Sequence, residues 1–119
     1  MKKILGIVVL GLLLSGCAYE YEPPKPDFAG TLGSYNYEVY LKYREWGGCE
    51  AVLNLKNNNS KIQTVYVELT AFDDKGKNVD MTNFIISNLS KNETAERDSA
   101  FTRVSCYDIK KLRTSIKDY

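Results

Sequence analysis

A strict two-residue repeat in the middle of the chain most constrains the fold. In residues 64–71 every second side chain is apolar, and the alternating set consists of Val65, Val67, Leu69 and Ala71. Side chains of a β-strand point alternately to its two faces, so this pattern predicts a strand with one buried face. β-Branched and aromatic residues dominate both faces, as a pleated surface prefers. We therefore expect residues 64–71 to be the strongest strand of the chain.

The same period recurs between clusters of glycine, asparagine and aspartate, which favour turns. Further strands are expected at residues 35–42, 49–56, 78–86 and 112–116, with the polar segment 94–102 as an edge strand. Turns are expected at residues 47–48, 57–60, 72–77 and 88–92, and one helical turn at 108–111. About seven short strands in residues 31–119 predict a single all-β domain, a small antiparallel β-sandwich.

The first 16 residues have the layout of an export signal. Lys2 and Lys3 give a positive start, residues 4–14 form an apolar run, and Ser15 and Gly16 are small. The run is shorter than the about 20 residues that a membrane-spanning helix needs, and no polar face marks it as a buried helix of the domain. We therefore expect residues 1–16 to be a cleaved signal peptide.

The residues at the end of this segment, Leu14-Ser15-Gly16-Cys17, resemble the lipobox of bacterial lipoproteins. The resemblance implies that the Cys17 thiol is diacylated and that cleavage then makes Cys17 the first residue, whose amine is acylated. Together such chains would anchor the protein firmly, whereas one acyl chain binds only weakly. Ala18 follows the cysteine, and by resemblance to enterobacterial sorting this implies the outer membrane, with the domain on the periplasmic side.

Residues 17–30 are expected to hold the domain away from the membrane. Pro23, Pro24 and Pro26 prevent a helix and favour an extended, polyproline-like tether. The tether is either a plain spacer or a proline-rich ligand for a partner.

Two cysteines remain in the exported part of the chain, Cys49 and Cys106. An even pair in an exported protein predicts a disulfide. Closing a loop of about 60 residues stabilises a fold by about 4 kcal/mol, which matters in a domain this small. The alternatives are two free thiols or a metal site, but the chain has no histidine and no Cys-x-x-Cys pair, which disfavours zinc. We expect no metal and no cofactor.

A second resemblance concerns the end of the strongest strand. Leu69-Thr70-Ala71-Phe72-Asp73, followed by Gly76, is similar to the signature of the small immunoglobulin-like FxLYD domains of bacterial envelope proteins. The similarity extends over residues 51–101, with Ala71 and Phe72 where leucine and tyrosine are usual, and the cysteine pair is a further departure. It implies an immunoglobulin-like β-sandwich and no particular activity.

A conspicuous aromatic set lies in the first half of the domain. Its members are Tyr35, Tyr37, Tyr40, Tyr43, Trp46 and Tyr66. Exposed aromatic residues often mark contacts with sugars or proteins. Tyr40 and Tyr66 share strand faces with charged residues, so they are the candidate binding surface. The alternative is ordinary packing within the sheets.

Two charged sets have alternative interpretations. The oxygen-rich loop of Asp73, Asp74, Asn78 and Asp80 is either a hairpin turn or a calcium site, although its spacing does not match an EF-hand. The C-terminal part is basic and could meet anionic headgroups or form a solvated sheet face; it contains Arg103, Lys110, Lys111, Arg113 and Lys117.

The chain offers no recognisable catalytic machinery. Without histidine it cannot build a Ser-His-Asp or Cys-His site, and it has neither a G-x-S-x-G motif nor a phosphate-binding glycine loop. Its formal charge of +1 becomes −1 once Lys2 and Lys3 are removed, which gives no argument for nucleic acid.

We therefore predict that the protein is not an enzyme but a non-enzymatic binding or accessory module of the cell envelope. It would contact the membrane through lipidated Cys17. It would contact an envelope protein through the strand edge at residues 94–102 or through the aromatic face. The alternatives are an inhibitor of a periplasmic hydrolase, or a binder of a small ligand or sugar.

Replacing the anchor residue tests the membrane assignment. Cells that express the wild-type chain should incorporate a clickable palmitate analogue into this protein, and the Cys17→Ser variant should incorporate none, because a hydroxyl forms no thioether. Gel fluorescence after click labelling measures both. A labelled Cys17→Ser protein would contradict the assignment.

Overall fold

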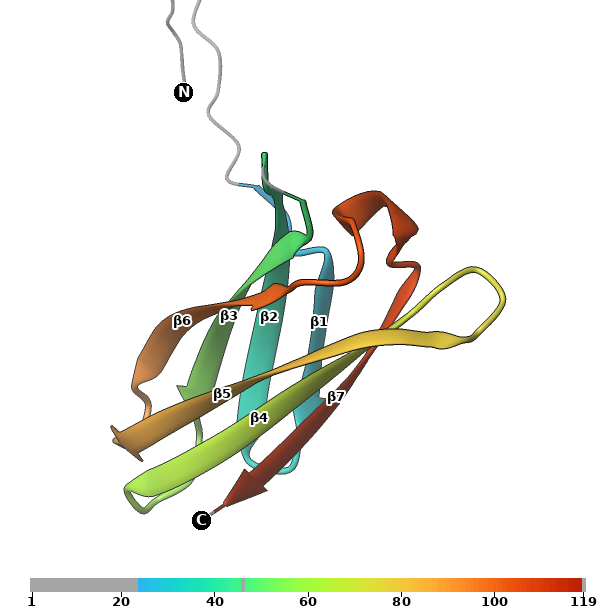
Figure 1. Cartoon of the computed structure of the whole chain (residues 1–119). Coiled ribbons are helices and arrows are strands. Elements are labelled where there is room, and N and C mark those ends of the chain that lie inside the picture. The colour runs from blue at the N-terminus through green and yellow to red at the C-terminus, as the bar shows by residue number, and fades with distance from the viewer. Residues whose placement is uncertain (1–23, 46, 119) are drawn as a thin grey trace, which may run out of the picture.

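The computed structural model describes residues 24–45 and 47–118, which form two antiparallel sheets packed face to face (Figure 1). The strands are β1 (Phe28–Leu32), β2 (Tyr35–Tyr43), β3 (Cys49–Asn57), β4 (Gln63–Phe72), β5 (Asn78–Leu89), β6 (Thr94–Phe101) and β7 (Lys111–Asp118), with a 3₁₀ turn η1 (Cys106–Asp108) before β7. One sheet has the order β1-β2-β3-β6 and the other β5-β4-β7. The predicted antiparallel sandwich of seven strands is confirmed.

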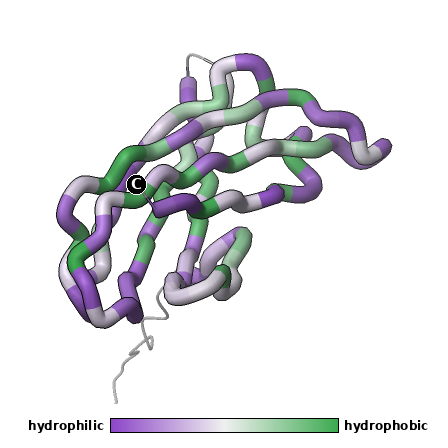
Figure 2. The backbone as a smooth tube through the Cα atoms, turned by 90° about the horizontal axis from the view of Figure 1, so that it is seen from below, coloured by the Kyte–Doolittle hydropathy of each residue, from purple (hydrophilic) through white to green (hydrophobic). Residues whose placement is uncertain are grey.

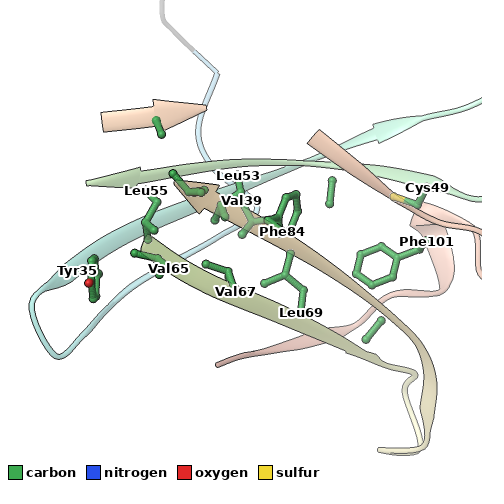
Figure 3. Packing of buried hydrophobic residues seen from close by; sticks show 14 of the residues in the cluster. Tyr35, Val39, Cys49, Leu53, Leu55, Val65, Val67, Leu69, Phe84 and Phe101 are labelled. Carbon is green, nitrogen blue, oxygen red and sulfur yellow. The ribbon is translucent and has the colours of Figure 1, made fainter. Parts of the chain in front are cut away.

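The two central strands supply the middle of the core. β3 and β4 follow one another in the chain but lie in different sheets. Their inward side chains have no solvent exposure: Cys49, Ala51, Leu53 and Leu55 on β3, and Val65, Val67, Leu69 and Ala71 on β4. Figure 3 shows several of these residues facing one another between the sheets. The two-residue repeat predicted both buried faces.

Hydrophobic and hydrophilic residues alternate along the strands, as Figure 2 shows. This alternation leaves each sheet with an outer face, directed away from the other sheet, that is mostly polar. Among the described residues no helix is long and apolar enough to cross a membrane. The expected signal peptide and Cys17 lie outside the described residues.

The Cys49–Cys106 disulfide closes one end of the sandwich. It ties the first residue of β3 to η1, and the predicted pairing is confirmed. Phe101 is fully buried at this end of the core (Figure 3). Gly48 has φ of 79° and passes so close to β6 that a Cβ would lie 2.4 Å from the Phe101 carbonyl oxygen. The chain can therefore reach Cys49 only with a glycine at this position.

A buried amide holds the other end of the sandwich. Asn57, at the end of β3, has no solvent exposure. Its Nδ2 donates to the carbonyl oxygens of Lys61 at 3.0 Å and Leu89 at 2.9 Å, and its Oδ1 accepts from the Asn59 N–H at 2.7 Å. Its backbone also bonds to Glu93 and Asn92. One side chain therefore joins the β3–β4 turn to the end of β5.

The turns form where asparagine and glycine predict them. In the loops, Asn92 has φ of 63° and Gly76 has φ of 76°, whereas Asn88, with φ of 55°, lies within β5 near its end. Several boundaries differ from expectation. β1 begins at Phe28, within residues 17–30 that we assign to the tether. β5 continues through Leu89, whereas we expect its strand to end at residue 86 and a turn to begin at 88, and the 3₁₀ turn ends at Asp108 instead of beginning there.

Removing the Asn57 amide should destabilise the fold. Asn57→Ala removes a partner from the buried Leu89 carbonyl and from the part-buried Asn59 N–H, so the free energy of unfolding should fall by about 3 kcal/mol. Asn59→Ala, two positions along the same turn, is the matched control and should cost less than about 1 kcal/mol. Urea unfolding followed by circular dichroism measures both, and equal losses would contradict the role of Asn57.

Candidate binding surfaces

Tyr40 lies on the outer face of the β1-β2-β3-β6 sheet. It pairs with Val52 on β3, which is only 6 % exposed although it lies outside the main core. A shallow hollow of about 340 Å³ lies here, and it is lined by Pro24, Lys25, Asp27, Tyr40, Leu41, Lys42, Val52, Asn54 and Glu96. The Tyr40 hydroxyl donates to Glu38 Oε1 at 3.3 Å. Desolvation and the Glu38 carboxylate raise the pKa of the Tyr40 hydroxyl.

Tyr66 lies on the outer face of the other sheet, so the structure does not bring Tyr40 and Tyr66 together. Tyr66 pairs with Ile85 on β5 and with Lys117 on β7. Ile85 is 55 % exposed, and Met81, four positions away along β5 and opposite Thr70, is 49 % exposed. Tyr66, Met81 and Ile85 form what we call the Tyr66 face. Met81 and Ile85 could have been found from the sequence because they stand at odd-numbered positions of the strand. The buried residues Phe84 and Ile86 stand at even-numbered positions and so point to the opposite face.

The other aromatic residues are divided between the core and one end of the sandwich. Tyr35 is buried, and Tyr37 packs against the core. Tyr43 is exposed, with its ring centroid 6.0 Å from that of Tyr107 near the disulfide. Trp46 lies outside the described residues. The described members of the aromatic set therefore do not form one surface.

Three cations of the basic C-terminal part form a row on the outer side of β7. Lys111, Arg113 and Lys117 are exposed. They stand at odd-numbered positions of the strand, so their side chains point to the same face. The Arg113 guanidinium lies 5.3 Å from the centroid of the Phe72 ring on β4, a cation–π contact. We call these three residues the β7 basic row. Arg103 and Lys110 lie elsewhere, in the loop regions before β7.

The acidic loop predicted as a hairpin or a calcium site is a hairpin between β4 and β5. Asp73 Oδ1 accepts from the N–H groups of Lys75 and Lys77, both at 2.9 Å. The Lys77 N–H is the main cause of the lowered pKa of Asp73. Asp80 accepts from the backbone of Met81 and of Arg103. Within residues 24–45 and 47–118, no group of three or more acidic or cysteine side chains is placed to hold a metal ion.

A wider hollow of about 560 Å³ lies beside this hairpin. Its lining mixes both charges and includes Asp73, Lys77, Arg103, Asp108 and Lys110. The lining carboxylates of Asp73 and Asp108 are used within the fold, since Asp73 holds the hairpin and Asp108 accepts from the Ser105 hydroxyl at 3.3 Å. The hollow is therefore a polar junction between loops, in which these two carboxylates already have partners within the fold.

The two sides of the sandwich are joined differently. On one side β5 lies against β6, and the Thr82 and Ser99 hydroxyls form a hydrogen bond between the sheets. On the other side β1 and β7 are neighbours. There the Tyr35 hydroxyl donates to the Asp118 carboxylate at the end of β7.

Comparison of the chain with protein-family models, curated proteins and solved structures found no match. The functional interpretation of the surfaces described above therefore depends on their structure and chemistry alone.

The Tyr35–Asp118 contact should make stability depend on alkaline pH. Burial, followed by the hydrogen bond to Asp118, raises the pKa of Tyr35. A raised pKa favours the protonated folded form, so this stability is present below the ordinary tyrosine pKa of about 10 and is lost as pH rises above it.

Urea unfolding at pH 8 to 11 measures this dependence. The wild-type free energy of unfolding should fall more steeply with pH than that of Tyr35→Phe. Tyr43→Phe is the control because Tyr43 is 66 % exposed, and it should follow the wild type. Parallel curves for wild type and Tyr35→Phe would contradict the assignment.

Proposed function

We propose that this protein is a membrane-anchored bacterial lipoprotein whose β-sandwich is a non-enzymatic binding or accessory module of the cell envelope. Lipidated Cys17 would hold it at the outer membrane, with the domain in the periplasm. The FxLYD-like signature around Leu69–Asp73 remains part of this proposal, since it indicates an envelope domain without a fixed activity.

Two features support an exported, anchored protein. The apolar segment before Cys17 has the length and flanks of a signal peptide. The Cys49–Cys106 disulfide is typical of oxidising compartments such as the periplasm.

The Tyr66 face is the main observation that supports a binding role. Met81 and Ile85 expose about half of their surfaces on the outer face of their sheet, directed away from the core. Exposed apolar side chains, methionine among them, beside a tyrosine and surrounded by polar residues are typical of protein interaction surfaces. The sheet edges offer a second means of contact, because an edge strand can pair with an extended segment of a partner.

Photo-crosslinking in cells tests the proposal. A photoreactive amino acid would replace Tyr40, Tyr66 or Glu96 in the full-length chain, expressed with its own signal. We expect a discrete adduct with one envelope protein from at least one position, identified by mass spectrometry. The unanchored Cys17→Ser chain carrying the same probe is the control and should give a weaker adduct.

The absence of any adduct from a folded, abundant and anchored protein would contradict a stable envelope partner. Adducts that are equally strong with and without the anchor would contradict a role for the membrane in positioning the domain.

A further inference from the structure

β7 is a regular edge strand of the β5-β4-β7 sheet. It pairs with β4 along its whole length, without a register shift, from Phe72 opposite Lys111 to Val65 opposite Asp118. Among the described residues, no backbone hydrogen bond is made to the other side of this strand. An edge strand has N–H and C=O groups directed away from its sheet, so β7 can accept one more strand.

The side of the sandwich next to this edge is incompletely filled. Leu112 and Ile116 of β7, and Phe28 and Tyr37 of the other sheet, pack against the core but remain partly exposed. Leu32 at the end of β1 is 37 % exposed. The central strands β3 and β4, by contrast, bury their inward side chains completely. We call these five residues the β1–β7 seam, and an added strand with apolar inward side chains would cover it.

The other edges are protected. β5 lies against β6, and the Thr82–Ser99 contact joins them. β6, the edge expected from the sequence to contact a partner, is an edge strand, but exposed Arg97 occupies an inward position opposite Leu53. A charged residue at an inward position is a common protection against strand addition. β1 has only five residues.

The β7 basic row specifies the outer side chains of an added strand. Lys111, Arg113 and Lys117 are exposed on the outer face next to the free edge. Residues directly across two strands interact most strongly, and opposite charges there are favourable. Acidic side chains at the outward positions of an added strand would therefore complement the row.

We propose that β7 is the docking strand for a partner protein, which adds an extended segment of alternating apolar and acidic residues. The segment can pair with up to the eight residues of β7, with its apolar side chains on the β1–β7 seam and its acidic side chains on the basic row. This inference rests on the proposed binding function and names the edge and the chemistry of the partner.

The basic row also argues against a second copy of this chain as the occupant. Two β7 strands paired antiparallel about Thr114 would place Lys111 of each copy opposite Lys117 of the other. Like charges directly opposite one another are destabilising. The same row that attracts an acidic segment therefore disfavours self-pairing.

A synthetic peptide tests the recognition. The probe is a fluorescent eight-residue peptide in which valine alternates with glutamate, titrated at physiological salt against the full anchored chain in detergent micelles. We expect saturable binding by fluorescence anisotropy. A peptide with lysine in place of glutamate should not bind. The absence of binding by the glutamate peptide, or equal binding of both peptides, would overturn the proposal.

Charge reversal locates the site. The double variant Lys111→Glu/Lys117→Glu should bind the glutamate peptide about tenfold more weakly and should gain affinity for the lysine peptide. The matched control is Lys42→Glu/Lys56→Glu, which reverses two exposed lysines on the outer face of the other sheet. It should bind like the wild type because charges more than about 8 Å away are screened. Equal weakening in both double variants would overturn the β7 site.

Peptide N-methylation distinguishes strand addition from simple charge attraction. Only every second N–H of an added strand points toward its neighbour. Methylation of all valine nitrogens or of all glutamate nitrogens should therefore abolish binding in one case and preserve it in the other. Equal effects of the two modifications would overturn strand addition.

A crosslinking probe at Ser115 separates this inference from the proposed function. An adduct with an envelope protein from Ser115 supports both. Adducts from Tyr40, Tyr66 or Glu96 but not from Ser115 overturn the β7 site and leave the proposed function standing. No adduct from any position contradicts the proposed function itself. An adduct between two copies of this chain overturns the choice of occupant.

Discussion

The packing of β3 against β4 is the interaction on which the rest of the structure depends. The two strands are consecutive, and residues 58–62 carry the chain from the centre of one sheet to the centre of the other. Their eight inward side chains are completely buried, so a change of register in either strand would turn its apolar side toward water. Of the other strands, β2, β5, β6 and β7 each pair with one of these two, and β1 pairs with β2.

This arrangement also determines which edges remain available. β2 and β6 flank β3, whereas β5 and β7 flank β4. The disulfide and Asn57 hold the two ends of the sandwich, and the contact between β5 and β6 closes one side. On the other side, where Tyr35 bonds to Asp118, the inward side chains of the β1–β7 seam remain partly exposed among the described residues. The binding role that we propose thus follows from how seven strands are divided between two sheets.

Most of the fold, but only part of the candidate surface, could be predicted from the sequence. The alternation at Val65–Ala71 and the turn signals at Gly76 and Asn92 are local properties, and they predicted strands and turns correctly. β1 was missed because Gly30, at its centre, has no side chain to show an alternation. The position of β1 is determined by its pairing with β2, where the Tyr37 ring covers Gly30. The alternation of side chains along the strands assigns Tyr40 and Tyr66 to outer faces, but it does not show that the two faces belong to different sheets. Likewise, the polarity of residues 94–102 identified an edge strand, whereas the open edge at β7 depends on the order of strands in space.

The proposed docking requires that β7 is an open edge in the free protein. Residue-resolved amide hydrogen exchange of the purified full chain tests this most directly. We expect the amides to alternate along β7: those bonded to β4 exchange slowly, and those directed away from β4 exchange rapidly. The amides of residues 65–71 in β4, which are paired on both sides, should all exchange slowly. Uniformly slow exchange from Lys111 to Asp118 would show that the edge is already covered and would contradict the account.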